Sequence, residues 1–168
     1  FRLSEHMLQI RELLSGLGEA HSAFVTTIML QRAGVNARFV DLSGWRDEGN
    51  VTLDERIAQA MEGIDPQTEM PIVTGYAQCA EGLMREFDRG YSEVTFSKLA
   101  ALTGAREAII HKEFHLSSCD PKLVGEHAVK KIGRTNYDVA DQLSNMGMEA
   151  IHPKAAKTLR QADVPLRV

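Results

Sequence analysis

The 168-residue sequence has little of what marks several large classes of protein. It contains two cysteines, Cys79 and Cys119, which are too few for a disulfide framework, so two reduced thiols are the default expectation. Basic residues are not in excess, because the net charge is −4 and the pI is near 5.9. No unbroken run of about 18 apolar residues and no secretory signal are visible. We therefore expect no nucleic-acid partner and no membrane partner.

What is present is the composition of an ordinary globular domain, with 43% apolar and 25% charged residues. Helical patterns cover 4–15, 20–32, 52–62, 94–103, 136–145 and 153–162. Strand patterns cover 37–42, 72–75 and 107–111, with a last strand near the end of the chain. In the first helix, Met7, Ile10 and Leu14 form one apolar stripe. The alternation predicts an α/β fold with a mostly parallel sheet, whose ligands lie at the carboxyl ends of the strands.

The most informative segment is 86–95, where Arg89, Gly90 and Ser92 come just before an apolar helix. Arginine can bind a carboxylate through two parallel hydrogen bonds. Glycine lets a backbone N–H approach an anion closely, and a helix N-terminus favours negative charge. The segment therefore predicts a site for an anionic amino acid. Taken alone, the segment is more typical of a solvated charged loop, since runs of charge usually face water.

Local signals elsewhere predict helix ends. Thr52 and Glu55 have the spacing of a capping box, and Thr135 with Asp138 is a second capping arrangement. Gly147 suits the position just after a helix, and Pro153 suits the first turn of the next. These signals predict two consecutive helices joined by a connection that ends in His152-Pro153.

Together these segments resemble the aspartate kinases of the amino acid kinase superfamily. Segment 86–95 is similar to the family's Gly-Arg-Gly-Gly-Ser-Asp-Thr-Thr motif, with Glu93 in place of its aspartate. Segment 135–154 is similar to a Ser-Tyr-x-Glu helix followed by Gly-Ala-Lys-Val-Leu-His-Pro-Arg. Similar family segments are matched, in the family's order, by 18–22, 71–76 and 163–168. The resemblance covers nearly the whole chain.

The resemblance implies a three-layer α/β/α sandwich and an ATP-dependent, Mg²⁺-dependent transfer of phosphate to the side-chain carboxylate of aspartate, giving 4-phosphoaspartate. It implies that Arg89 and Glu93 act in catalysis. Aspartate would be bound by Glu19, Arg89, Gly90 and Ser92. Phosphoryl transfer depends mainly on positioning and on neutralising charge, so few protein groups are required for it.

The nucleotide side departs from the family pattern. The family's nucleotide contacts fall here on His111, Lys112, Ser117 and Lys122, and its lysine before Val-Leu-His-Pro falls on Glu149. A carboxylate cannot replace an ammonium beside phosphates, so ATP would be held differently, weakly or not at all. These departures resemble the divergent aspartate kinases associated with ectoine biosynthesis. Two alternatives remain open: another enzyme of the superfamily, or a pseudokinase acting as a regulatory subunit.

His111 and His115 are four residues apart, but without the His-Glu-x-x-His pattern of zinc proteases, so we expect no protein-bound metal site. The chain begins at Phe1. The resemblance implies a preceding Lys-Phe-Gly-Gly segment with a phosphate-facing lysine, and ACT regulatory domains after the last strand. We therefore expect 1–168 to be a partial catalytic domain that is inactive alone. The full-length protein would be a cytoplasmic homo-oligomer.

Overall fold

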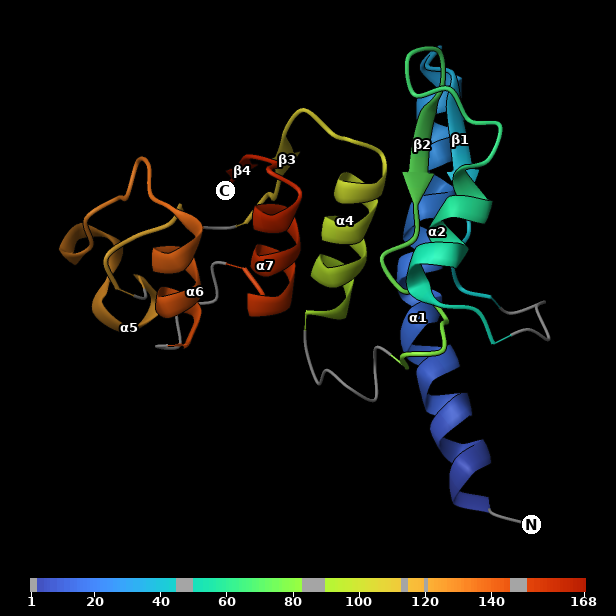
Figure 1. Cartoon of the computed structure of the whole chain (residues 1–168), viewed down its shortest axis with the longest axis horizontal. Helices are drawn as coiled ribbons and strands as arrows, with labels where there is room; N and C mark the ends of the chain where they lie inside the picture. The colour runs from blue at the N-terminus through green and yellow to red at the C-terminus, as the bar shows by residue number, and fades with distance from the viewer. Residues whose placement is uncertain (1–2, 45–49, 83–89, 113–114, 120, 146–150) are drawn as a thin grey trace. The chain divides into compact units, whose positions relative to one another are not determined.

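The structure is a computed structural model that describes residues 3–44, 50–82, 90–112, 115–119, 121–145 and 151–168 (Figure 1). The chain divides into two compact units, Phe1–Thr95 and Phe96–Val168. The boundary between them falls inside helix α4 (Tyr91–Leu102).

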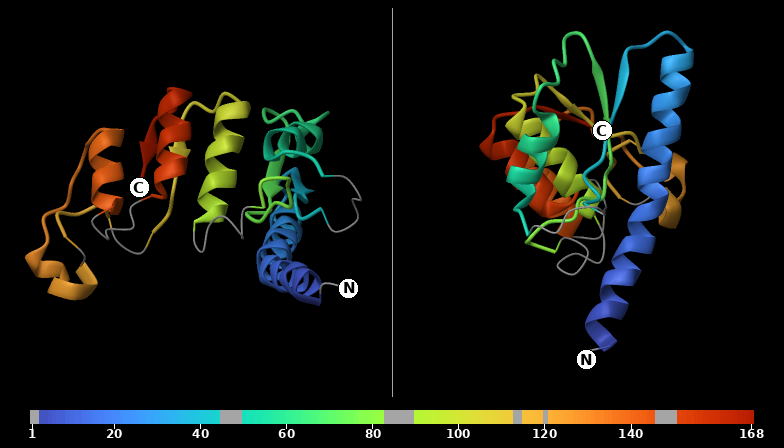
Figure 2. Two further views of the ribbon diagram at one scale, coloured as in Figure 1. Left: turned by 60° about the horizontal axis from the view of Figure 1, so that its bottom comes forward. Right: turned by 90° about the vertical axis from the view of Figure 1, so that its right-hand side faces the viewer.

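The first unit is a parallel strand pair between two helices. Strand β1 (Ala37–Val40) pairs in parallel with β2 (Met70–Val73), and helix α2 (Leu53–Met61) connects them. Helix α1 (Leu3–Arg32) covers one face of the pair, and α2 lies on the opposite side (Figure 1 and Figure 2). Parallel strands need a crossover connection of this kind, so β1, α2 and β2 form one βαβ element.

Helix α1 is one continuous helix where two were predicted, over 4–15 and 20–32. Gly16 does not end it, because Gly16 is buried against the ring of Tyr76. A Cβ at this position would lie 2.4 Å from Cδ1 of Tyr76. Glycine costs about 1 kcal/mol relative to alanine inside a helix, and close packing on the strand pair offsets that cost. The two-helix prediction was wrong because sequence patterns do not reveal this tertiary contact.

The two faces of α1 differ in a way that the apolar stripe did not predict. The face toward the strands buries small side chains, namely Ala23 and Thr27 beside Gly16. Most of the large apolar side chains described on the helix are exposed instead: Met7, Ile10, Leu13, Leu14, Leu17, Phe24, Val25 and Met29. Ile28 and Leu30 are half-buried, and Phe24 also packs edge-on against Phe39 of β1. By length and composition alone, Ile10–Arg32 would suffice to cross a membrane. Its packing on a strand pair is that of a covering helix in an α/β unit.

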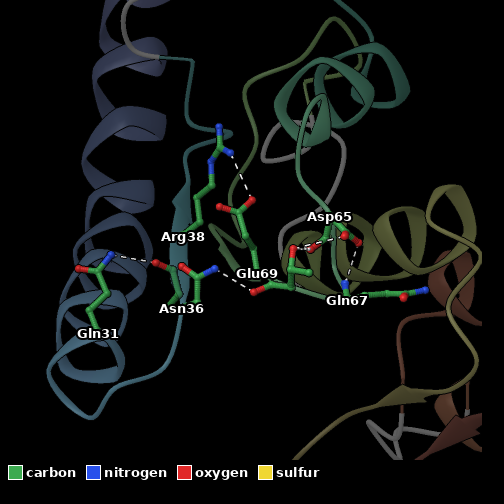
Figure 3. Close-up of polar contacts among 8 residues, drawn as sticks. Gln31, Asn36, Arg38, Asp65, Gln67 and Glu69 are labelled. Atoms are coloured by element: carbon green, nitrogen blue, oxygen red, sulfur yellow. Dashed lines mark hydrogen bonds and ion pairs between the residues drawn. The ribbon is translucent and has the colours of Figure 1, made fainter.

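Polar contacts fix the amino-terminal ends of β1 and β2 (Figure 3). The side chain of Gln31 donates to the carbonyl of Ala37 over 2.8 Å. Asn36 donates to the carbonyl of Thr68 over 2.8 Å. Arg38 and Glu69 form an exposed ion pair at 3.4 Å. These side-chain contacts occupy the amino-terminal ends of the two strands. The carboxyl ends of the strands are therefore where a binding site is expected.

The capping box predicted for α2 is confirmed. The hydroxyl of Thr52 accepts from the backbone N–H of Glu55 at 3.2 Å, and the Glu55 carboxylate accepts from the backbone N–H of Thr52 at 2.8 Å. Hydrogen bonds from the backbone and then the side chain of Thr52 lower the pKa of the Glu55 carboxyl. The Glu81 carboxylate also accepts from the N–H of Leu53 at 3.0 Å. The polar side chains around the first turn of α2 therefore determine where this helix begins.

The second unit contains another parallel pair, β3 (Ala108–Ile109) with β4 (Leu166–Arg167). Helices α6 (Tyr137–Asn145) and α7 (Pro153–Gln161) pack together beside it. Small and branched apolar residues fill the core of this unit: Ala100, Ala108, Ala140, Ile151, Ala155, Ala156, Leu159 and Val164. Helices with short parallel strands confirm the predicted α/β class. Among the described residues, the four strands form two separate pairs.

Helix α6 has a different cap from the predicted one. The side chain of Asn136, rather than Thr135, accepts from the backbone N–H of Val139 at 2.9 Å. Asp138 instead pairs with Arg160 of α7. Pro153 does begin α7, as predicted, and His152 caps that helix by accepting from the N–H of Lys154. Gly147 lies outside the described residues.

Other element bounds also differ from expectation. Helix α4 begins at Tyr91, three residues before the predicted start at 94, and β3 is shorter than the predicted strand 107–111. Between the predicted strand 107–111 and the predicted helix 136–145, where no element was predicted, the structure has a short helix, α5 (Pro121–Val124), and a 3₁₀ turn, η1 (Glu126–Ala128). The earlier start of α4 matters most for function, because it places Ser92 and Glu93 in the first turn of a helix.

We expect Gly16→Ala to lower the free energy of unfolding by about 1–3 kcal/mol, because the new methyl must displace the ring of Tyr76. Gly18→Ala is the matched control two residues along the same helix, where a Cβ would meet no atom within 4 Å. That substitution should stabilise the chain by up to about 1 kcal/mol. Urea denaturation of both variants measures the difference. Equal effects would contradict the packing of Gly16 on Tyr76.

Candidate functional site

The candidate site lies at the carboxyl end of β2, where the segments that follow β1 and β2 are tied together. The buried hydroxyl of Thr74 accepts from the backbone N–H of Leu42 at 2.9 Å and donates to the carbonyl of Tyr76 at 3.0 Å. The N–H of Gln78 donates to the carbonyl of Leu42 at 3.0 Å. These bonds fix Gly75 between two buried residues, two positions after the end of the strand.

Side chains from α1 and α4 meet over Gly75. The hydroxyl of Ser92 donates to Oε1 of Glu19 at 2.6 Å, and both side chains are partly buried. A Cβ at position 75 would lie 2.6 Å from Oε2 of Glu19 and 2.9 Å from Oγ of Ser92. Only glycine leaves room for this contact. The structure therefore brings together Glu19 and Ser92, which the sequence placed in one substrate site.

Gly90 and the first turn of α4 form the second wall of the site. Gly90 has a φ of +80°, a conformation that favours glycine, and its carbonyl accepts from the N–H of Val94 at 3.1 Å. Helix α4 thus begins immediately after Gly90. The first N–H groups of a helix attract anions, so this end of α4 suits a carboxylate. Glu93 lies in the same turn and is half-buried.

Tyr91 is a member of the site that the sequence prediction did not include. Burial raises the pKa of its hydroxyl, and the negative charge of Glu19 and a hydrogen bond with Glu19 raise it further. Its ring packs edge-on against Tyr76, with ring centroids 6.2 Å apart and an interplanar angle of 88°. The sequence did contain a signal that could have pointed to Tyr91, because this tyrosine stands where the similar family motif has glycine.

One carboxylate oxygen of the site has no partner in the described part of the chain. Oε2 of Glu19 is buried and accepts no hydrogen bond there. A buried acceptor left unsatisfied costs about 1–3 kcal/mol, and more when it is charged. A ligand cation would relieve that cost. The site therefore pairs a negative side chain with the positive end of a helix dipole. This arrangement suits an amino acid whose ammonium lies at Glu19 and whose carboxylate lies at the N-terminus of α4.

The remaining residues predicted for the site lie either outside the described residues or in the second unit. Arg89 and Glu149 lie outside the described residues. His111 and Lys122 are exposed in the second unit. The hydroxyl of Ser117 is buried and donates to the carbonyl of Cys119 at 2.9 Å, so it is used within its own loop. The predicted nucleotide role of these residues, and of Lys112, stays a prediction. In the described ranges no three His, Cys, Asp or Glu side chains gather as a metal site.

Comparison with known proteins agrees with this architecture. The model of the amino acid kinase family matches residues 3–168. The chain therefore belongs to the amino acid kinase family, and the family resemblance predicted from the sequence is confirmed.

Within that family the chain is similar to several aspartate kinases. The chain is 62% identical over 168 residues to the aspartate kinase Ask_Ect of Stutzerimonas stutzeri, and this match covers all of the chain and 35% of that protein. It is 26% identical over 178 residues to an aspartokinase of Schizosaccharomyces pombe, covering 99% of the chain and 34% of that protein. The chain thus spans about a third of the length of these relatives.

Solved structures share the fold. E. coli aspartokinase III, in a crystal structure with aspartate and ADP, aligns with a TM-score of 0.69 at 19% identity, covering 89% of this chain and 35% of that one. The aspartate kinase from Synechocystis aligns with a TM-score of 0.65 at 22% identity, covering 90% of this chain and 25% of that one. These likenesses confirm the α/β fold of an amino acid kinase.

We expect Glu19→Gln to lower the pKa of Tyr91 toward its ordinary value of 10.0, because the substitution removes the negative charge that disfavours the phenolate. The pKa should stay somewhat raised, since burial is the larger cause. Tyrosinate absorbance measured against pH reports the change. Tyr137 is the internal control, because its raised pKa arises from burial and from Asp163 in the other unit. Superimposable titration curves for the parent and the variant would contradict the Glu19–Tyr91 contact.

Proposed function

We propose that the chain is part of the catalytic domain of an aspartate kinase, and that it carries the aspartate side of the active site. The observation that carries this proposal is the Ser92–Glu19 contact beside the N-terminus of α4, with Oε2 of Glu19 buried and available to a cation. The family match and the 62% identity to Ask_Ect support it.

In the proposed reaction a side-chain carboxylate oxygen of aspartate attacks the γ-phosphorus of ATP. A new bond forms between this oxygen and the γ-phosphorus. The bond between the γ-phosphorus and the oxygen that bridges it to the β-phosphate breaks, and ADP leaves with the electron pair of that bond. Glu19 would hold the substrate ammonium, and Arg89 with the start of α4 would hold carboxylate. Glu93, in the first turn of α4, would line the same site and act as a catalytic residue. The protein thus contributes position and charge, which is what phosphoryl transfer chiefly requires.

The nucleotide would be bound by His111, Lys112, Ser117 and Lys122, with Glu149 where relatives have a lysine. Mg²⁺ in such sites is usually held by substrate phosphates together with one or two carboxylates, and it neutralises charge on the transferred group. The identity to Ask_Ect supports the divergent, ectoine-associated group. We place the reaction in the cytoplasm and expect the full-length enzyme to be a homo-oligomer. The 168-residue chain alone should be inactive.

The direct test is product formation by the full-length enzyme with Mg-ATP. We expect ADP release that depends on aspartate, together with an acyl phosphate that hydroxylamine traps as a hydroxamate. Glutamate, N-acetylglutamate and a nucleoside monophosphate serve as alternative acceptors, and phosphorylation of one of these in place of aspartate would show another enzyme of the superfamily. Aspartate binding without nucleotide binding in isothermal titration would show a pseudokinase.

Arg89→Lys in the full-length enzyme should raise the KM for aspartate much more than the KM for ATP. An ammonium cannot reproduce the two parallel hydrogen bonds of a guanidinium. Losing one contact with a charged group costs about 1.5–3 kcal/mol, which corresponds to about a tenfold to 150-fold rise. Steady-state kinetics with each substrate varied in turn measure both constants. An unchanged aspartate KM would remove Arg89 from the substrate site.

Glu149→Lys should tighten Mg-ATP binding and Lys122→Ala should weaken it, since the first adds and the second removes a cation near the same polyanion. Isothermal titration at low and at moderate salt measures both affinities. The differences should shrink as salt increases, because screening weakens interactions between exposed charges. ATP affinities that neither substitution changes would show that this loop is not the nucleotide site.

A further inference from the structure

The hydrogen bonding between β1 and β2 continues past the ends of both strands, but it is no longer regular there. Just after β2, the N–H of Thr74 donates to the carbonyl of Val40 at 3.1 Å. The bonds of a parallel ladder are evenly spaced, so the next donor to β1 would be the N–H of Tyr76, and its acceptor would be the carbonyl of Leu42. The structure instead has the N–H of Gln78 on that carbonyl, at 3.0 Å. Additional backbone is therefore accommodated between Thr74 and Gln78.

Residues 75–77 form a bulge at the carboxyl end of β2, and the side chain of Thr74 holds its base. In a regular ladder the N–H of Leu42 would donate to a backbone carbonyl. Here the Thr74 hydroxyl takes the place of that carbonyl and accepts from the N–H at 2.9 Å. The hydroxyl donates its one hydrogen to the carbonyl of Tyr76 at 3.0 Å. One side chain thus replaces a ladder bond and closes the bulge on itself.

Gly75, the first residue of the bulge, lies under the contact between α1 and α4. Its lack of a side chain leaves the space in which the hydroxyl of Ser92 reaches Glu19. Oε2 of Glu19 is only 2.6 Å from the position that a Cβ would occupy. A small shift of the backbone at Gly75 therefore changes the space around the carboxylate.

Tyr76, the second residue of the bulge, contacts both helices. Its ring packs against Gly16 of α1 and edge-on against the ring of Tyr91 in α4. The hydrogen bond from Thr74 fixes the backbone carbonyl of Tyr76, and the backbone in turn limits where the ring can lie. Because the residue is only 5% exposed, its close-packed neighbours transmit any displacement. The spacing of α1 and α4 at the site therefore depends on the bulge.

We propose that Thr74 is a positioning residue for the aspartate site, whose hydroxyl holds the 75–77 bulge and thereby sets the spacing between Glu19 and Ser92. The inference rests on the proposed function. The Thr74 side chain is buried, so it acts on the substrate through the bulge and not by contact. Bulges occur often beside active sites, where they re-aim neighbouring side chains. Affinity for aspartate is then set in part by a hydroxyl beneath the site.

The test is Thr74→Val in the full-length enzyme, which removes the hydroxyl and nearly keeps the shape of the side chain. Leu42 is fully buried, so its N–H loses its acceptor without gaining water. We expect amide hydrogen exchange at Leu42 to become at least about tenfold faster. The KM for aspartate should rise about threefold to tenfold, with the KM for Mg-ATP unchanged. A mere loss of folded enzyme would lower the apparent kcat and leave both KM values unchanged.

Two further variants separate the hydroxyl from general effects on folding. Thr74→Ser keeps the hydroxyl and removes a buried methyl group, so it should lower stability but retain the parent's KM for aspartate. Thr27→Val is the matched control, because Thr27 is a buried threonine of the same unit whose hydroxyl donates to the carbonyl of Ala23 within α1 at 2.8 Å. It should leave both the aspartate KM and the exchange at Leu42 unchanged.

Faster exchange at Leu42 in Thr74→Val with an unchanged aspartate KM would overturn the inference and leave the proposed function standing. Unchanged exchange at Leu42 would overturn it too, because the hydroxyl would then not hold the bulge. A raised aspartate KM in Thr74→Ser would also overturn it, whether or not Thr74→Val folds, since the serine keeps the hydroxyl. A parent enzyme that does not phosphorylate aspartate would overturn the proposed function, and the inference would fail with it.

Discussion

The hydrogen bond from Ser92 to Glu19 is the contact on which the arrangement of the site depends. It joins residues 73 positions apart, one in the middle of α1 and the other in the first turn of α4. Its geometry requires that α1 continue through Gly16, that the residue two positions after the end of β2 be glycine, and that α4 begin at Tyr91. Each requirement is met by a residue whose local contacts explain its type.

The same contact leaves an electrostatic imbalance in the free protein. A buried carboxylate oxygen without a partner is unfavourable, and burying a charge is tolerated when a counter-charge is supplied. In the proposed function the substrate supplies that counter-charge. The free energy of binding would then include the relief of an unfavourable group already in place, and a substrate lacking the ammonium would forgo that part.

Much of the local structure could be predicted from the sequence. The cap of α2 and the start of α7 at Pro153 depend on residues within one turn, so their patterns are sufficient. The continuity of α1 could not be predicted, because it depends on Tyr76, which is distant in sequence. The outward stripe of α1 was missed for a related reason: periodicity identifies an apolar face, but the strands pack against the face with small side chains. The pairing of Glu19 with Ser92 was accessible only through family resemblance.

The close approach at Gly75 has a consequence for how this sequence can change over evolutionary time. The side chains of Glu19 and Ser92 and the backbone of Gly75 come from separate segments and share one small volume, so the tolerance of each position depends on the other two. A side chain could appear at position 75 only if residue 19 or residue 92 became shorter or turned away. Among homologues, positions 19, 75 and 92 should therefore vary together or not at all.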